Sequence, residues 1–80
     1  MEKKVYVYHC SSNKMKFGLT YDRTGSNLPE KACDGQWILY RVLTLTPDGP
    51  PVISGSSPKD ILDELDSYGF IIQETRTSFR

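Results

Sequence analysis

Residues 57–69 carry the strongest local signal in this chain, and they predict its one clear helix. Ser57 stands directly before Pro58, and an acidic residue follows three places after the serine. A serine cap accepts a hydrogen bond from a backbone N–H that the helix start leaves unpaired. Proline suits the first helical position, and a carboxylate in the first turn interacts favourably with the helix dipole. We therefore predict a helix over Pro58–Tyr68 that stops at Gly69.

An apolar stripe along this helix requires a second layer of structure. Its members recur at helical spacing and are Ile61, Leu62, Leu65 and Tyr68. One amphipathic helix cannot bury such a stripe alone, so it should pack across a sheet. The remaining face carries four carboxylates, which we expect to be a solvated surface: Asp60, Asp63, Glu64 and Asp66.

Four other segments have the composition of β-strands. They are rich in β-branched and aromatic residues and cover 4–10, 16–22, 37–45 and 70–77. Both faces of 4–10 are largely apolar, which is typical of a central strand. Residues 29–32 are expected to form a single helical turn. The order β-β-β-α-β predicts an α+β fold, with an antiparallel sheet of about four strands and one C-terminal amphipathic helix packed on one face, in a single small domain over 1–80.

The third strand contains one charge, Arg41. Simple alternation places Arg41 on one face with the following apolar residues: Trp37, Leu39, Leu43 and Leu45. Either the guanidinium extends to the sheet margin, or this face is the outer one.

Charge makes a dedicated nucleic-acid binder an unfavoured class. Ten basic residues balance ten acidic ones, whereas affinity for nucleic acid rests largely on an excess of positive charge. Residues 1–41 nevertheless hold seven bases and four acids, against three and six in 42–80. Such a division fits either two halves that attract each other within one fold or a partner site.

No apolar run approaches the roughly 18 residues of a membrane helix, and the first ten residues lack the features of a signal peptide. We therefore expect no membrane partner and a cytoplasmic location. In that reducing compartment Cys10 and Cys33 should be free thiols.

Residues able to support metal or nucleophilic chemistry are few: His9, Cys10, Cys33 and Asp34. His9 and Cys10 are adjacent in a strand and should point to opposite faces, so one ion cannot bind both. No enzyme or cofactor motif occurs, and we assign no catalytic residue, metal or cofactor. An enzyme or metal protein that pairs His9 with Cys33 remains the alternative.

Tyrosines suggest a further alternative, a sheet face that stacks single-stranded nucleic acid. The candidates are Tyr6, Tyr8, Tyr21 and Tyr40, with lysines and Arg41 nearby in the sequence. Tyrosine is also an ordinary strand residue, so the pattern carries little weight by itself.

By elimination we expect a small binding or regulatory protein that contacts an unidentified protein partner, as a monomer or a weak dimer. An exposed sheet face or an unpaired edge strand is the usual docking surface for such a domain. Arg23, Trp37 and Arg41 are the candidate binding residues, because Trp and Arg dominate interface energetics. A buried structural role is the competing interpretation for Trp37.

Three segments, 21–29, 35–37 and 61–70, together resemble a pattern found in short bacterial proteins of unknown role. The shared features are turns, a proline and core residues, and they extend over most of the chain. The resemblance implies a bacterial cytosolic protein and carries no activity with it.

Overall fold

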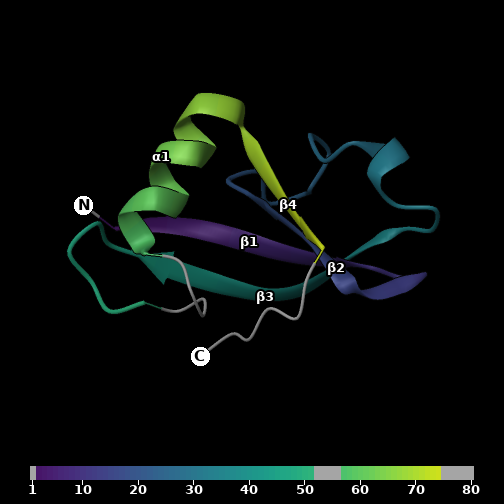
Figure 1. The fold of residues 1–80 in the computed structure, drawn as a ribbon, viewed down its shortest axis with the longest axis horizontal. Helices are drawn as coiled ribbons and strands as arrows, with labels where there is room; N and C mark the ends of the chain where they lie inside the picture. Colours follow the sequence, from purple (N-terminus) through teal and green to yellow (C-terminus); the bar gives the residue numbers. More distant parts are fainter. Residues whose placement is uncertain (1, 52–56, 75–80) are drawn as a thin grey trace.

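The computed structural model describes residues 2–51 and 57–74 (Figure 1). Its elements are β1 (Lys3–Cys10), β2 (Asn13–Thr20), the short 3-10 helix η1 (Glu30–Ala32), β3 (Trp37–Leu45), α1 (Pro58–Tyr68) and β4 (Phe70–Glu74). The order β-β-β-α-β and the α+β class are confirmed. The predicted extension of the last strand over 75–77 lies outside the described residues.

The four strands form one antiparallel sheet in the order β3-β1-β2-β4. β1 is a central strand, as its two apolar faces predict. β2 begins three residues earlier than predicted, because the turn of the first hairpin takes only Ser11 and Ser12. β3 and β4 are the outer strands, and α1 leads directly into β4 (Figure 1).

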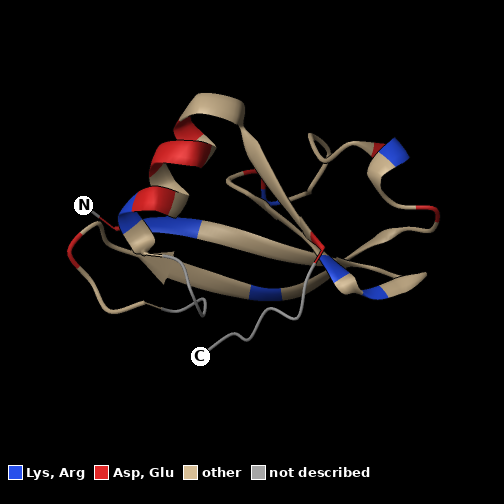
Figure 2. Ribbon diagram, in the orientation of Figure 1, with Lys and Arg blue, Asp and Glu red and all other residues tan. Residues whose placement is uncertain are grey.

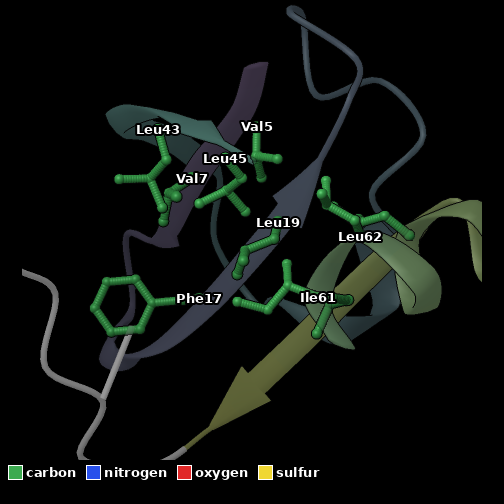
Figure 3. Close-up of a cluster of buried hydrophobic side chains, with 10 residues drawn as sticks. Val5, Val7, Phe17, Leu19, Leu43, Leu45, Ile61 and Leu62 are labelled. Carbon is green, nitrogen blue, oxygen red and sulfur yellow. The ribbon is translucent and has the colours of Figure 1, made fainter. Parts of the chain in front are cut away.

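One face of the sheet, called the helix side below, packs against α1. Strand residues two apart point to the same face, so Val5 and Val7 of β1 lie on this side with their neighbours Leu19 and Leu43. Three leucine and isoleucine side chains of α1 complete the cluster, and Figure 3 shows two of them, Ile61 and Leu62, beside the strand residues. These helix residues are Ile61, Leu62 and Leu65.

The ends of α1 follow the sequence signals. The Ser57 side chain accepts a hydrogen bond from the backbone of Asp60 at 3.2 Å, and Gly69 closes the helix at φ 84°. Tyr68 departs from the prediction, because 73% of its surface is exposed. It is the last helical residue, where the chain turns into β4. Leu65 is the last residue that the helix contributes to the core.

The opposite face, the loop side, is covered by the segment that runs from β2 to β3, residues 21–36, apart from Tyr21, which lies beside α1. Leu28 packs over Gly18, where a Cβ atom would come within 2.9 Å of the leucine side chain. Gly25 lies against the ring of Tyr8 with φ 70°, a conformation that strongly favours glycine. The Tyr8 hydroxyl donates to the carbonyl of Arg23, which ties the loop to β1.

A disulfide between Cys10 and Cys33 adds a covalent tie on the loop side. The prediction of free thiols is therefore wrong. The two cysteines are 23 residues apart, and only the return of the loop across β1 brings their Cα atoms to 5.7 Å. Both side chains are buried, at 1% and 5% exposure.

A bulge in β3 separates Arg41 from two residues that were predicted to share its face, Trp37 and Leu39. Arg41 is opposite Val7 of β1, but the next β1 residue, Tyr8, is opposite Leu39, so one β3 residue is unmatched. Arg41 therefore shares the helix side with Leu43, whereas Leu39 lies on the loop side. Alternation fails because the extra residue shifts the phase of the first four positions of the strand.

The two oppositely charged halves of the sequence meet within the fold (Figure 2). Lys3 lies 3.8 Å from Asp66 of α1, and Lys16 lies 3.7 Å from Glu74 of β4. Each of these ion pairs joins a base from 1–41 to an acid from 42–80. Lys3, Asp66 and Glu74 are about half exposed, so the Lys3–Asp66 pair contributes little to stability; Lys16 is 20% exposed.

Candidate functional site

The outer edge of β3 is the candidate functional surface. Within residues 2–51 and 57–74, no strand pairs with the side of β3 that faces away from β1. Four apolar side chains of this strand are 44–52% exposed. We call them the β3 patch: Ile38, Leu39, Tyr40 and Val42. An edge strand that exposes apolar side chains is a template for pairing with another chain.

The helix-side half of the patch consists of Ile38 and Tyr40. The Tyr40 ring meets Phe17 edge-on, with centroids 5.5 Å apart, and meets His9 at 6.0 Å. Together with Lys14 these rings line a shallow hollow of about 240 Å³. The aromatic contacts hold Tyr40 on this face of the sheet.

The loop-side half consists of Leu39 and Val42. Val42 is opposite Tyr6, and Leu39 is opposite Tyr8. Tyr8 is buried beneath Gly25, and burial raises the pKa of its hydroxyl, with Asp22 adding to the shift. The loop covers this face over β1 and β2, but Leu39 and Val42 of β3 stay about half exposed.

The three predicted binding residues do not come together. Arg41 is half-buried on the helix side, and Arg23 is exposed in the loop, where its carbonyl accepts from Tyr8. Trp37 packs beside Leu28 over Gly18, and its indole N–H donates to the carbonyl of Pro29 at 3.2 Å. The competing structural interpretation of Trp37 agrees with these contacts.

A second hollow, of about 420 Å³, opens between the loop and Trp37. Two of its lining hydroxyls are engaged internally, because the Asp22 carboxylate accepts from Ser26 at 2.6 Å and from Thr24 at 2.7 Å. The bond from Ser26, followed by those from Thr24, lowers the pKa of Asp22 to about 2. This cluster shapes the loop rather than presenting free groups to a ligand.

The structure does not provide the geometry that a metal site or a nucleophilic pair of His9 with Cys33 requires. Cys33 is disulfide-bonded and carries no thiolate for a metal or a nucleophilic reaction. His9 lies against Tyr40 on the helix side, while Cys10 joins Cys33 on the loop side, as the alternation of β1 predicts. In the described part of the chain, no three His, Cys, Asp or Glu side chains are grouped to hold a metal ion.

The tyrosines do not form one platform. Tyr6 and Tyr8 face the loop side, but Tyr40 faces the helix side. Tyr21 lies beside α1 and donates to Asp66 at 3.0 Å; burial and this hydrogen bond raise its pKa to about 12. No continuous stacking surface joins these rings.

Sequence reasoning did not identify Ile38, Leu39 and Val42 as site residues, and gave Tyr40 only as part of an aromatic platform, because an edge strand and a central strand have the same apolar composition. Comparisons with protein-family models, with curated proteins and with solved structures find no match to this chain. Among the residues the structure describes, no helix has both the length and the apolar character needed to cross a bilayer.

Proposed function

We propose that this chain is a small binding protein that acts by contact with a protein partner through the β3 patch. One observation carries the proposal: β3 exposes Ile38, Leu39, Tyr40 and Val42 along an edge without a neighbouring strand among the described residues. Burial of these apolar side chains by a partner lowers the free energy. Backbone hydrogen bonds along the strand edge would fix the direction and the register of a bound strand.

This proposal differs in its residues from the sequence-based one. Trp37 supports the loop through its indole, so substitution there changes folding before it changes binding, whereas Arg23 contributes only its backbone carbonyl to the contact with Tyr8. Arg41 lies in the same strand as the patch, between Tyr40 and Val42, on the helix side. The protein-contact function is kept, and the surface moves to the edge of the sheet.

Retention of partners from source cells tests the proposal. Tagged wild-type protein is compared with Val42→Lys, which places a charge on the exposed edge, a device that natural edge strands use against pairing. We expect Val42→Lys to lose at least about 90% of any partner that wild-type retains, equivalent to about 1.4 kcal/mol of binding free energy. The readout is quantitative mass spectrometry at matched bait levels.

Tyr68→Lys is the matched control, because Tyr68 is an exposed aromatic residue on α1, away from β3. It should retain the same partners as wild-type. Far-UV circular dichroism and thermal midpoints must agree among the three proteins. Equal retention by Val42→Lys and wild-type, with folding intact, contradicts the proposal.

The disulfide bears on where the protein acts. A reducing cytoplasm keeps thiols reduced, so the Cys10–Cys33 bond weighs against the cytoplasmic location expected from the sequence. We propose that the chain works where this bond persists. Acid quenching of source cells, followed by alkylation under denaturing conditions that expose the buried sulfurs, tests this: unmodified Cys10 and Cys33 support an oxidising compartment, and alkylated ones support the cytoplasm.

A further inference from the structure

The β3 bulge sets an unusual pattern of faces along the outer edge. Positions 37, 39, 42 and 44 face the loop side, because their β1 neighbours do. Positions 38, 41 and 43 face the helix side by the same pairing. Tyr40, the unmatched residue, joins them through its contacts with His9 and Phe17. The order of faces over 37–44 is therefore the same when it is read in either direction.

That symmetry suits a neighbouring strand with the same pattern of faces, such as a second β3. Directly opposite residues of an antiparallel pair must lie on the same face of the sheet. If a second β3 aligns so that Leu39 is opposite Val42, then position 38 is opposite 43 and 40 is opposite 41, and every pair from 37 to 44 matches. A shift of one residue brings Leu39 opposite Leu43, which face opposite sides. A regular strand leaves one β3 residue unmatched, as β1 does.

Charge is compatible with the same register. β3 contains no acidic residue and one cation, Arg41. In the matched register position 41 is opposite position 40, so the two Arg41 residues do not form a like-charge pair. A register centred on Arg41 places the two cations face to face and also mismatches the faces on either side of them.

We infer that the occupant of the β3 patch is a second copy of this chain, bound antiparallel about a two-fold axis with Leu39 opposite Val42. This inference rests on the proposed function and identifies its partner. The assembly is one continuous eight-stranded sheet that is closed at the β3 contact, so it does not propagate through this edge. Leu39 and Val42, each about half exposed in the single chain, cover one another.

Such a dimer is weak. An interface made by one strand from each copy lies at the small end of specific interfaces, at or below about 1,200 Å² in total. Sedimentation velocity from roughly 5 to 500 µM should therefore show an average mass that rises from one chain toward two. Tyr68→Lys should behave like wild-type, and Val42→Lys should stay a monomer at every concentration with its circular dichroism unchanged.

Cysteine pairs test the register. We prepare Leu39→Cys and Val42→Cys separately, with the native Cys10–Cys33 bond verified by mass. Under mild oxidation a mixture of the two should form a covalent dimer through positions 39 and 42, which lie within disulfide range when directly opposite. Each variant alone should stay uncross-linked, because its new cysteine is then opposite a native leucine or valine.

The outcomes separate this inference from the proposed function. A wild-type chain that is monomeric throughout, with no cross-link in the mixture, overturns the dimer. If that monomer still retains another protein in a Val42-dependent way, the proposed function stands with a different partner. A cross-link in Leu39→Cys alone overturns the register, since it places that residue opposite itself.

Discussion

The two faces of the sheet are covered by different means. On the helix side, α1 contributes Ile61, Leu62 and Leu65 to one apolar cluster with the strands, and burial of this surface supplies the stability (Figure 3). On the loop side, residues 21–36 have little regular structure and only one short 3-10 helix. There a disulfide, side-chain hydrogen bonds and a few close contacts replace the apolar layer.

The difference matters in a chain of 80 residues. A domain of this size buries only about 60% of the surface its unfolded chain exposes, so one apolar layer leaves little stability in reserve. A cross-link on the second face raises the stability without a second helix. Four substitutions or treatments test this division, and they are taken from the largest expected effect to the smallest.

Leu65→Ala removes the most buried side chain that α1 places in the helix-side cluster, at 1% exposure. We expect a loss of about 3–4 kcal/mol in the free energy of unfolding, from lost burial and the cavity left behind. Urea unfolding followed by circular dichroism measures it. Leu65→Met, which conserves volume, should cost less than about 1.5 kcal/mol, and Glu64→Ala on the exposed face should cost little. A small effect of Leu65→Ala contradicts the apolar basis of this face.

Reduction of Cys10–Cys33 breaks the covalent tie of the loop side. A cross-link closing 23 residues of separation stabilises the fold by about 3 kcal/mol in the chain-entropy model, so reduction should lower the free energy of unfolding by about that amount. Trp37, which packs over Gly18 beside Leu28, reports the loop by fluorescence, and circular dichroism reports the helix. If the fluorescence transition moves to lower urea than the dichroism transition, the loop is a separate unit; coincident transitions contradict that separation.

Asn27→Ala removes polar ties between the loop and the rest of the fold. The amide oxygen of Asn27 accepts from the buried hydroxyl of Thr20 at 2.6 Å, and its N–H donates to the carbonyl of Gly69 at 2.9 Å. We expect a loss of about 1–2 kcal/mol, because a buried donor loses its partner. The double variant Thr20→Val/Asn27→Ala should cost less than the sum of the single changes; strict additivity contradicts the coupling.

Acid should weaken the loop side through Asp22. The carboxyl pKa is about 2 in the fold and 3.8 ordinarily, so its stabilising effect is complete above about pH 4 and is lost as pH falls toward 2. Asp22→Asn should therefore be less stable than wild-type at pH 7 and should converge with it near pH 2, as measured by urea unfolding at both pH values. Asp48→Asn, in the turn after β3, is the control for the loss of a carboxylate. A gap between Asp22→Asn and wild-type that does not change with pH contradicts the assignment.

Local chemistry made the helix and the third strand predictable. The bounds of α1 and β3 agree with the expectation from the sequence, because a serine cap, a terminal glycine and a run of strand-forming residues act over neighbouring positions. The candidate site was only partly predictable. An edge strand was expected as a docking surface, but its residues were not identified, since composition does not reveal which strand lies at the edge.

The sequence by itself determined where the chain forms a helix or a strand, and that the helix must cover a sheet. Only the tertiary structure decided the partners: the order β3-β1-β2-β4, the Cys10–Cys33 bond, and the bulge that places Arg41 on the helix side and Leu39 on the loop side. The physical reason is the separation along the chain between the residues that interact. Caps, turns and side-chain periodicity depend on residues within about one helical turn, whereas strand order and the disulfide depend on contacts between segments distant in the chain, which no local pattern records.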